Sequence, residues 1–107
     1  MTYEETVPMP ESGEPVLAMS GDIDVASEHA WRREADVFLA ANPDLRNVTV
    51  DMSQVDFVDS RGMAVLVSLH TASLARGGKL ALVAVPRRIV KAIGVAGLDQ
   101  VFSITPA

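Results

Sequence analysis

The chain has no cysteine among its 107 residues, which excludes disulfide bridges, thiol chemistry and zinc sites built on thiolates. Aromatic side chains make up only 5% of a sequence that is 49% hydrophobic, so we expect an aliphatic core. No apolar run approaches the length that a bilayer-spanning helix requires. These absences indicate a small globular protein that does not enter the membrane.

Positive charge is scarce at the beginning of the chain. Residues 1–24 contain six acidic residues and no Lys or Arg, so this segment does not have the composition of a secretory signal. The formal net charge of −5 argues against nucleic acid or an anionic membrane as the main partner. We therefore expect a cytoplasmic protein that binds neither directly.

The sequence also lacks the common catalytic motifs. It contains no nucleophile elbow, P-loop, dinucleotide fingerprint or metal-ligand cluster, so we expect no enzyme, no cofactor and no metal site. A phospho-accepting receiver domain would have a similar length. Asp51 could serve as its aspartate, but Lys79 precedes a predicted strand where that fold needs a lysine at a strand end.

Predicted strands alternate with predicted helices along the chain. Strands are predicted at 16–20, 48–52, 80–85 and 101–104, with a further edge strand at 3–7 and a proline-rich connection at 8–15. Helices are predicted from the cap residue Ser27 to about residue 41, from Ser60 to the glycine pair 77–78, and after Pro86. This order predicts an α/β fold, a single domain over residues 1–107 with a mixed, mostly parallel sheet of four to five strands and about three to four helices.

The helix predicted after Ser60 has no charged side chain between residues 62 and 75. Apolar residues fall on two nearly opposite faces, one with Met63 and Leu66 around His70, the other with Val65 and Leu69. A surface helix normally has a charged outer face. Either this helix is buried on both sides, or one side meets a partner, which could be a second copy of the chain.

Ser60 stands where an apolar segment turns into this helix. A serine at that place can cap the helix by accepting a backbone N–H bond. The same end of a helix also accepts an anion such as phosphate. Ser60 is thus either a plain cap or a residue that carries a regulatory phosphate.

Four segments in order resemble one known family. They are the turn Ser-Gly-Asp-Ile-Asp at 20–24, the strand Val-Thr-Val-Asp-Met-Ser at 48–53 with the Val-Asp-Ser-Arg-Gly-Met signature at 58–63, the glycine pair 77–78, and Gly-Leu at 97–98. Over about its whole length the chain is similar to STAS domains, specifically to the stand-alone bacterial anti-sigma factor antagonists.

The resemblance implies a protein–protein switch that regulates transcription. In the family, the serine after the signature aspartate is phosphorylated by an anti-sigma factor with serine kinase activity; here that is Ser60. The unphosphorylated antagonist binds the anti-sigma factor and frees the sigma factor, phosphorylation releases it, and a serine phosphatase resets it. The implied partner-binding residues are Asp24, Asp59, Ser60, Arg61, Gly62 and Met63.

One departure from the family pattern and two alternative interpretations stay open at this point. Arg61 stands where the family usually has a small residue, and it could pair with a phosphate or with Asp59. Asp24 could be an ordinary turn aspartate. Many STAS domains are not phosphorylated, so the alternative is an interaction module that acts as a scaffold in a stress-sensing or transport assembly. In either role we expect a monomer or a weak homodimer. If Ser60 is phosphorylated, we expect the phosphate to block docking without refolding the domain.

Overall fold

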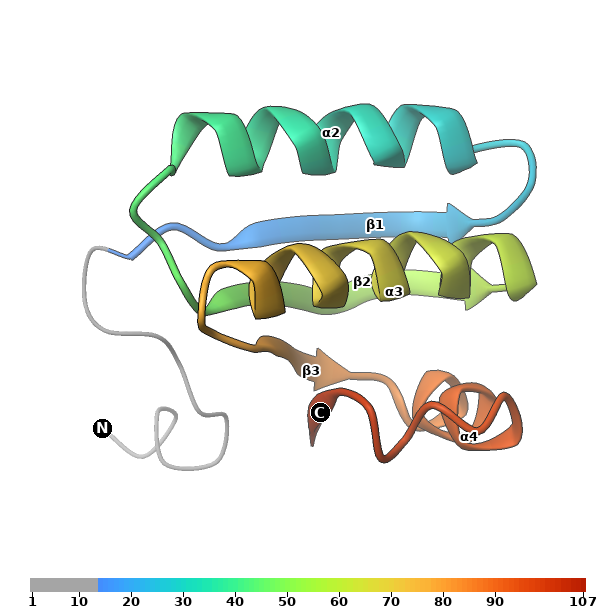
Figure 1. The fold of residues 1–107 in the computed structure, drawn as a ribbon. Coiled ribbons are helices and arrows are strands. Elements are labelled where there is room, and N and C mark those ends of the chain that lie inside the picture. Colours follow the sequence, from blue (N-terminus) through green and yellow to red (C-terminus); the bar gives the residue numbers. More distant parts are fainter. Residues whose placement is uncertain (1–13) are drawn as a thin grey trace, which may run out of the picture.

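A four-stranded parallel sheet forms the centre of the protein (Figure 1). The computed structural model describes residues 14–107. The strands lie in the order β1-β2-β3-β4, and each neighbouring pair is parallel. The elements are β1 (Leu17–Ile23), α2 (Glu28–Ala41), β2 (Val48–Val58), α3 (Ser60–Ala75), β3 (Leu80–Val85), α4 (Arg87–Val95) and β4 (Ser103–Pro106).

The helices are placed unevenly around the sheet. Helices α2 and α3 lie side by side on one face, and α4 lies at the end of the sheet where β2 and β3 finish (Figure 1). Parallel strands need crossover connections, and each helix supplies one. As a result, the carboxyl ends of the strands, the start of α3 and helix α4 all meet at one end of the molecule.

The core is aliphatic, as the composition predicts. Valine and leucine from the strands pack against α3 and α4, and Trp31 and Phe38 of α2 contact this cluster while only partly buried. Most residues of β3 are buried, which fits its nearly continuous apolar sequence. The fully buried side chains are mainly Met19, Ile23, Met52, Leu66, Leu69, Leu80, Leu82 and Ile93.

The predicted elements are present, with different ends for three strands. The last strand, predicted at 101–104, is β4 at Ser103–Pro106. Strand β1 continues past Ser20 to Ile23, and β2 continues past Met52 to Val58. The extension of β2 pairs with β1 alone, and its buried Val55 and Val58 hold it to the core. The four described strands are all parallel. The edge strand predicted at 3–7 and most of the connection predicted at 8–15 lie outside the described residues.

Helix α3 is buried on two sides. Met63 and Leu66 are buried on one of the predicted apolar faces, and Val65 and Leu69 are buried on the other. The reason is geometric: α3 packs against the sheet and also against α2, so both faces find a protein neighbour. Leu74 is 56% exposed near the end of the helix, where these neighbours no longer cover it.

The glycine pair ends α3 as predicted. Gly77 adopts a left-handed φ of 80°, and its N–H bonds to the carbonyl of Leu74 while that of Gly78 bonds to Ser73. This is the Schellman arrangement, which satisfies the last carbonyls of a helix. It turns the chain directly into β3.

Candidate functional site

The candidate site lies where β1 and β2 end next to each other. Ile23 of β1 pairs with Val58 of β2, so the turn after β1 and the first turn of α3 start from adjacent backbone positions. The N–H of Asp59 bonds to the carbonyl of Ile23 at 3.2 Å and continues this contact beyond the strands. Residues 24–27 and 59–63 are therefore neighbours in space.

Asp59, and not Ser60, caps helix α3. Asp59 Oδ1 accepts the N–H of Arg61 at 2.9 Å and the N–H of Gly62 at 3.0 Å. Its other oxygen, Oδ2, accepts the N–H of Val25 at 3.2 Å. The cap interpretation of Ser60 is thus wrong: a carboxylate one residue earlier takes the free N–H groups and also complements the helix dipole.

Ser60 is consequently the first residue of the helix itself. Its side chain is exposed and makes no hydrogen bond to any residue between 14 and 107. A hydroxyl in this position is held in place by the capped backbone around it. It remains available to another molecule.

Gly62 brings the start of α3 against the backbone of β1. A Cβ atom at this position would overlap the carbonyl oxygen of Ile23 and come within 2.8 Å of Val58 Cγ1. Only a residue without a side chain fits here. Gly62 is buried, and its close contact with β1 positions the backbone next to Ser60.

The turn that contains Asp24 has its own hydrogen bonds. Asp24 Oδ1 accepts the N–H groups of Ala26 and Ser27, both at 3.1 Å. Ser27 stands at the start of α2 as predicted, but its hydroxyl bonds to the carbonyl of Asp22 and to Asp24 instead of capping the helix. The carboxylate of Asp24 therefore shapes this turn, next to the residues that Asp59 holds.

The side chain of Arg61 bonds to Glu28 and not to Asp59. Its guanidinium donates to Glu28 Oε1 at 3.0 Å, and Arg32 donates to the other oxygen of Glu28 at 3.0 Å. Arg32 and Arg61 hold the pKa of Glu28 below its ordinary value. Arg32 also reaches Ser68 of α3 at 2.9 Å. Two arginines around one carboxylate thus fasten the start of α2 to α3.

A groove between α3 and α4 borders Ser60. Its apolar lining includes Val58, Met63, Ala92 and Val95, and Val95 is 82% exposed. The charged side chains that line it are Asp59, Arg88 and Lys91. Met63 is buried, so it forms the floor of this groove.

The contribution of α4 could not be foreseen from the motifs. Arg87, Arg88 and Lys91 have the composition of a solvated helix face, and nothing in their spacing points to Ser60. The contacts of α4 with β2 bring Arg88 and Lys91 to the groove beside Ser60, whereas Arg87 does not line it. The fold brings α4 next to the start of α3, although the two segments are distant in the sequence.

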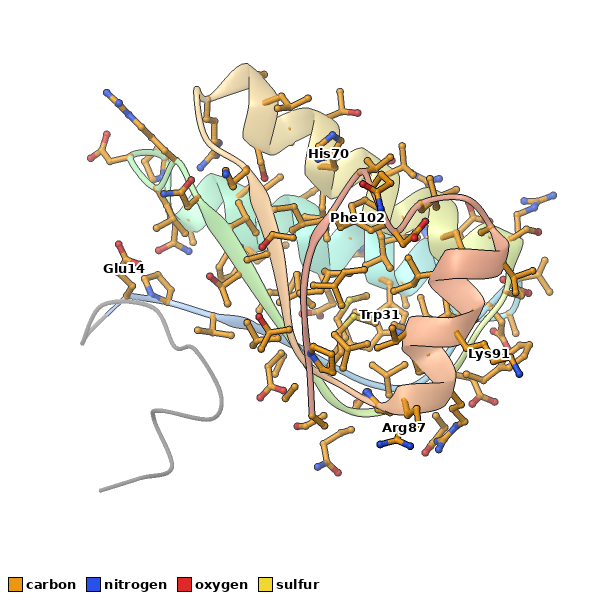
Figure 2. All side chains as sticks on the ribbon, turned by 90° about the horizontal axis from the view of Figure 1, so that it is seen from below. Glu14, Trp31, His70, Arg87, Lys91 and Phe102 are labelled. Atoms are coloured by element: carbon orange, nitrogen blue, oxygen red, sulfur yellow. The ribbon has the colours of Figure 1, made fainter. Side chains whose placement is uncertain are left out.

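His70, the histidine of α3, lies against an aromatic ring. The ring of His70 contacts Phe102 edge to face, with ring centroids 5.8 Å apart. Figure 2 shows the two labelled side chains next to each other. No group of three metal-ligating side chains gathers within residues 14–107. Over the same residues, no helix combines the length and apolar character needed to cross a bilayer.

Known proteins share both the sequence pattern and the fold. The profile of the STAS domain matches residues 6–107. The crystal structure of a Thermotoga maritima protein, proposed to be an anti-sigma factor antagonist, superposes with a TM-score of 0.72 at 19% identity, covering 92% of this chain and 82% of that one. The anti-sigma factor antagonist SpoIIAA in its unphosphorylated form superposes with a TM-score of 0.64 at 14% identity, covering 94% and 86%. No protein of curated function matches the chain by sequence.

Proposed function

Because this chain belongs to the STAS domain family, we propose that it is an anti-sigma factor antagonist whose binding is switched by phosphorylation of Ser60. In its unphosphorylated form it binds an anti-sigma factor that is also a serine kinase, and so frees a sigma factor for transcription. A serine phosphatase restores the binding form. These exchanges take place in the cytoplasm.

The observation that carries this proposal is the state of the Ser60 hydroxyl. The hydroxyl is exposed and stands beside an apolar groove. It does not cap the helix, because Asp59 is the N-cap of α3. A kinase needs access to a hydroxyl that the protein does not need for its own stability. Ser60 meets both conditions.

The modification is an ordinary phosphoryl transfer from ATP. The Oγ of Ser60 forms a bond to the γ-phosphorus, the bond between that phosphorus and the β,γ-bridging oxygen breaks, and ADP leaves with the electron pair. The hydroxyl proton passes to a base on the kinase. The antagonist contributes the nucleophile and its placement, and the kinase contributes the catalytic groups.

The expected effect of the phosphate is local. It adds a charge of about −1.5 to −2 at the border of the groove. The N–H groups of Arg61 and Gly62 already bond to Asp59, so the phosphate cannot bind to them without displacing this cap. The domain keeps its fold, and a partner that packs on the apolar surface meets a charged, hydrated group.

The test is transfer of radioactive phosphate. The full chain, its Ser60→Ala variant and a Ser68→Ala variant are each incubated with [γ-³²P]ATP and each anti-sigma factor kinase of the source organism in turn. Ser68 is a suitable control because it is an exposed serine of the same helix. We expect one kinase to label the wild type and Ser68→Ala but not Ser60→Ala.

Two results would overturn the proposal. One is equal labelling of Ser60→Ala, which would place the phosphate elsewhere. The other is the absence of label with every kinase, which would leave the scaffold role as the better account of this STAS domain.

A further inference from the structure

Acidic and basic residues are distributed unevenly along the sequence. No acidic residue occurs between Ser60 and Leu98, although this segment contains six basic residues and the whole chain is acidic. Helices α3 and α4 both belong to this segment. A negative group on Ser60 would therefore lie on a helix, α3, that belongs to this basic segment of an acidic protein.

Most of the cations near Ser60 are already paired. The guanidinium of Arg61 bonds to Glu28. That of Arg88 bonds to the carbonyl of Asp56 at 3.0 Å and lies 3.6 Å from its carboxylate. Each would have to give up an existing partner to bind a new anion.

Lys91 differs from these two arginines. It is exposed and forms no ion pair with any residue from 14 to 107. It lines the same groove as Ser60, with Ser60 on the α3 side and Lys91 on the α4 side. Figure 2 shows Lys91 on the outer side of α4, at the end of the molecule where α3 begins in Figure 1. Its flexible four-carbon stem lets the ammonium group move across the groove.

We propose that Lys91 is the counter-ion of phosphorylated Ser60, so that the phosphate is held across the apolar groove. This inference rests on the proposed function, because it concerns the same serine. The ion pair joins α3 to α4 above Met63 and next to Val95, the apolar residues that a partner would cover. The ion pair then covers the apolar groove, and the charge of the phosphate also repels a partner.

The negative groups around Ser60 set the background for this pairing. Asp59 lines the groove, and Asp24 lies in the adjoining turn. Both oppose a phosphate dianion. The effect of Lys91 on the phosphate is therefore measured as the difference in phosphate pKa between proteins with and without Lys91, and not from a single pKa value.

The experiment uses the full chain with phosphoserine installed at position 60 during translation, so that no kinase is needed. The second ionisation of the phosphate, ordinarily near a pKa of about 6, is followed by ³¹P NMR between pH 4.5 and 8 at low salt. The proteins compared are the otherwise unmodified chain and the variants Lys91→Ala, Lys91→Arg, Lys79→Ala and Arg61→Ala. Lys79 is the control, an exposed lysine that precedes β3.

We expect Lys91→Ala to raise the pKa of the phosphate by about 0.2–0.7 units, the range that corresponds to an exposed ion pair. In Lys91→Arg the phosphate should keep the lower pKa that it has in the chain with Lys91. In Lys79→Ala the phosphate pKa should not change. The difference shrinks at high salt because the pair is exposed to solvent.

An unchanged phosphate pKa in Lys91→Ala overturns the inference, and so does a larger rise in Arg61→Ala, which would make Arg61 the counter-ion. Either result leaves the kinase assay on Ser60 unaffected. Conversely, if no kinase labels Ser60, the proposed function fails although the titration can still show the pairing. The two claims are thus tested separately.

Discussion

Asp59 and Val25 stand 34 positions apart in the sequence and are joined by a hydrogen bond of 3.2 Å from the Val25 N–H to Asp59 Oδ2. The other oxygen of the same carboxylate caps α3. One side chain therefore fixes both the turn after β1 and the first turn of the helix that presents Ser60. The geometry of the site depends on this carboxylate.

Asp59→Ala should lower the free energy of unfolding by about 1–3 kcal/mol, combining a lost N-cap with a lost hydrogen bond to Val25. Urea unfolding measures the change. Asp56→Ala is the matched control, since Asp56 is 71% exposed and its carboxylate lies 3.6 Å from Arg88. Its effect should stay within about 0.5 kcal/mol. Equal effects of the two substitutions would show that Asp59 has no special role.

Gly62→Ala should destabilise the protein severely, by about 3 kcal/mol or more, because the new methyl group has to displace the backbone of Ile23 or the whole of α3. Gly94→Ala, inside α4, meets nothing within 4 Å. It should stabilise the protein by about 0.5–1 kcal/mol through helix propensity. Thermal unfolding of both variants checks the prediction, and a neutral Gly62→Ala would refute the close contact.

Ser60→Ala should change the free energy of unfolding by no more than about 0.5 kcal/mol. An N-cap serine replaced by alanine typically costs about 1 kcal/mol. Denaturant unfolding thus distinguishes the two roles that the sequence left open for this residue. A loss near 1 kcal/mol would restore the capping role and remove the reason to regard the hydroxyl as free for modification.

The contact between α2 and α3 should respond to acid. Arg32 and Arg61 lower the pKa of Glu28 in the folded chain below its ordinary value of 4.5. A carboxyl group shifted in this direction stabilises the fold at pH values above 4.5, and this contribution disappears as the pH falls through the lowered pKa. The stability difference between wild type and Glu28→Gln should therefore be largest near neutral pH and decrease below pH 4.5.

The measurement is urea unfolding at a series of pH values from 7 to 3. Glu34→Gln serves as the control, because Glu34 is an exposed residue of the same helix without an ion pair in residues 14–107. A difference that is constant with pH, or that grows toward acid, is incompatible with the lowered pKa of Glu28.

Much of the fold could be predicted from local patterns. The apolar run of β3, the glycine pair after α3 and the amphipathic pattern of α2 each specify an element by themselves. The ends of β1 and β2 could not be predicted, because the polar residues at 20–22 and 53–54 interrupt the apolar pattern. Both strands continue across these residues because β1 and β2 remain paired as far as Ile23 and Val58.

The site could be predicted only in part. The motif around Ser60 is contiguous in the sequence, but two adjacent residues, Asp59 and Ser60, are both good N-caps. Asp59 is the cap because its backbone is extended, whereas Ser60 already belongs to the helix. The ion pair between Arg61 and Glu28 and the groove with Lys91 each join distant segments. Contacts of this kind follow from the packing of α2 and α4 and leave no local signal.

The most direct test of Ser60 as a switch is the affinity for one purified anti-sigma factor, measured by calorimetry with the unmodified chain and with phosphoserine at position 60. We predict that the phosphate weakens binding by at least about 100-fold, which corresponds to about 2.8 kcal/mol. Circular dichroism should show that both forms keep the same fold. Equal affinity of the two forms would contradict the switch.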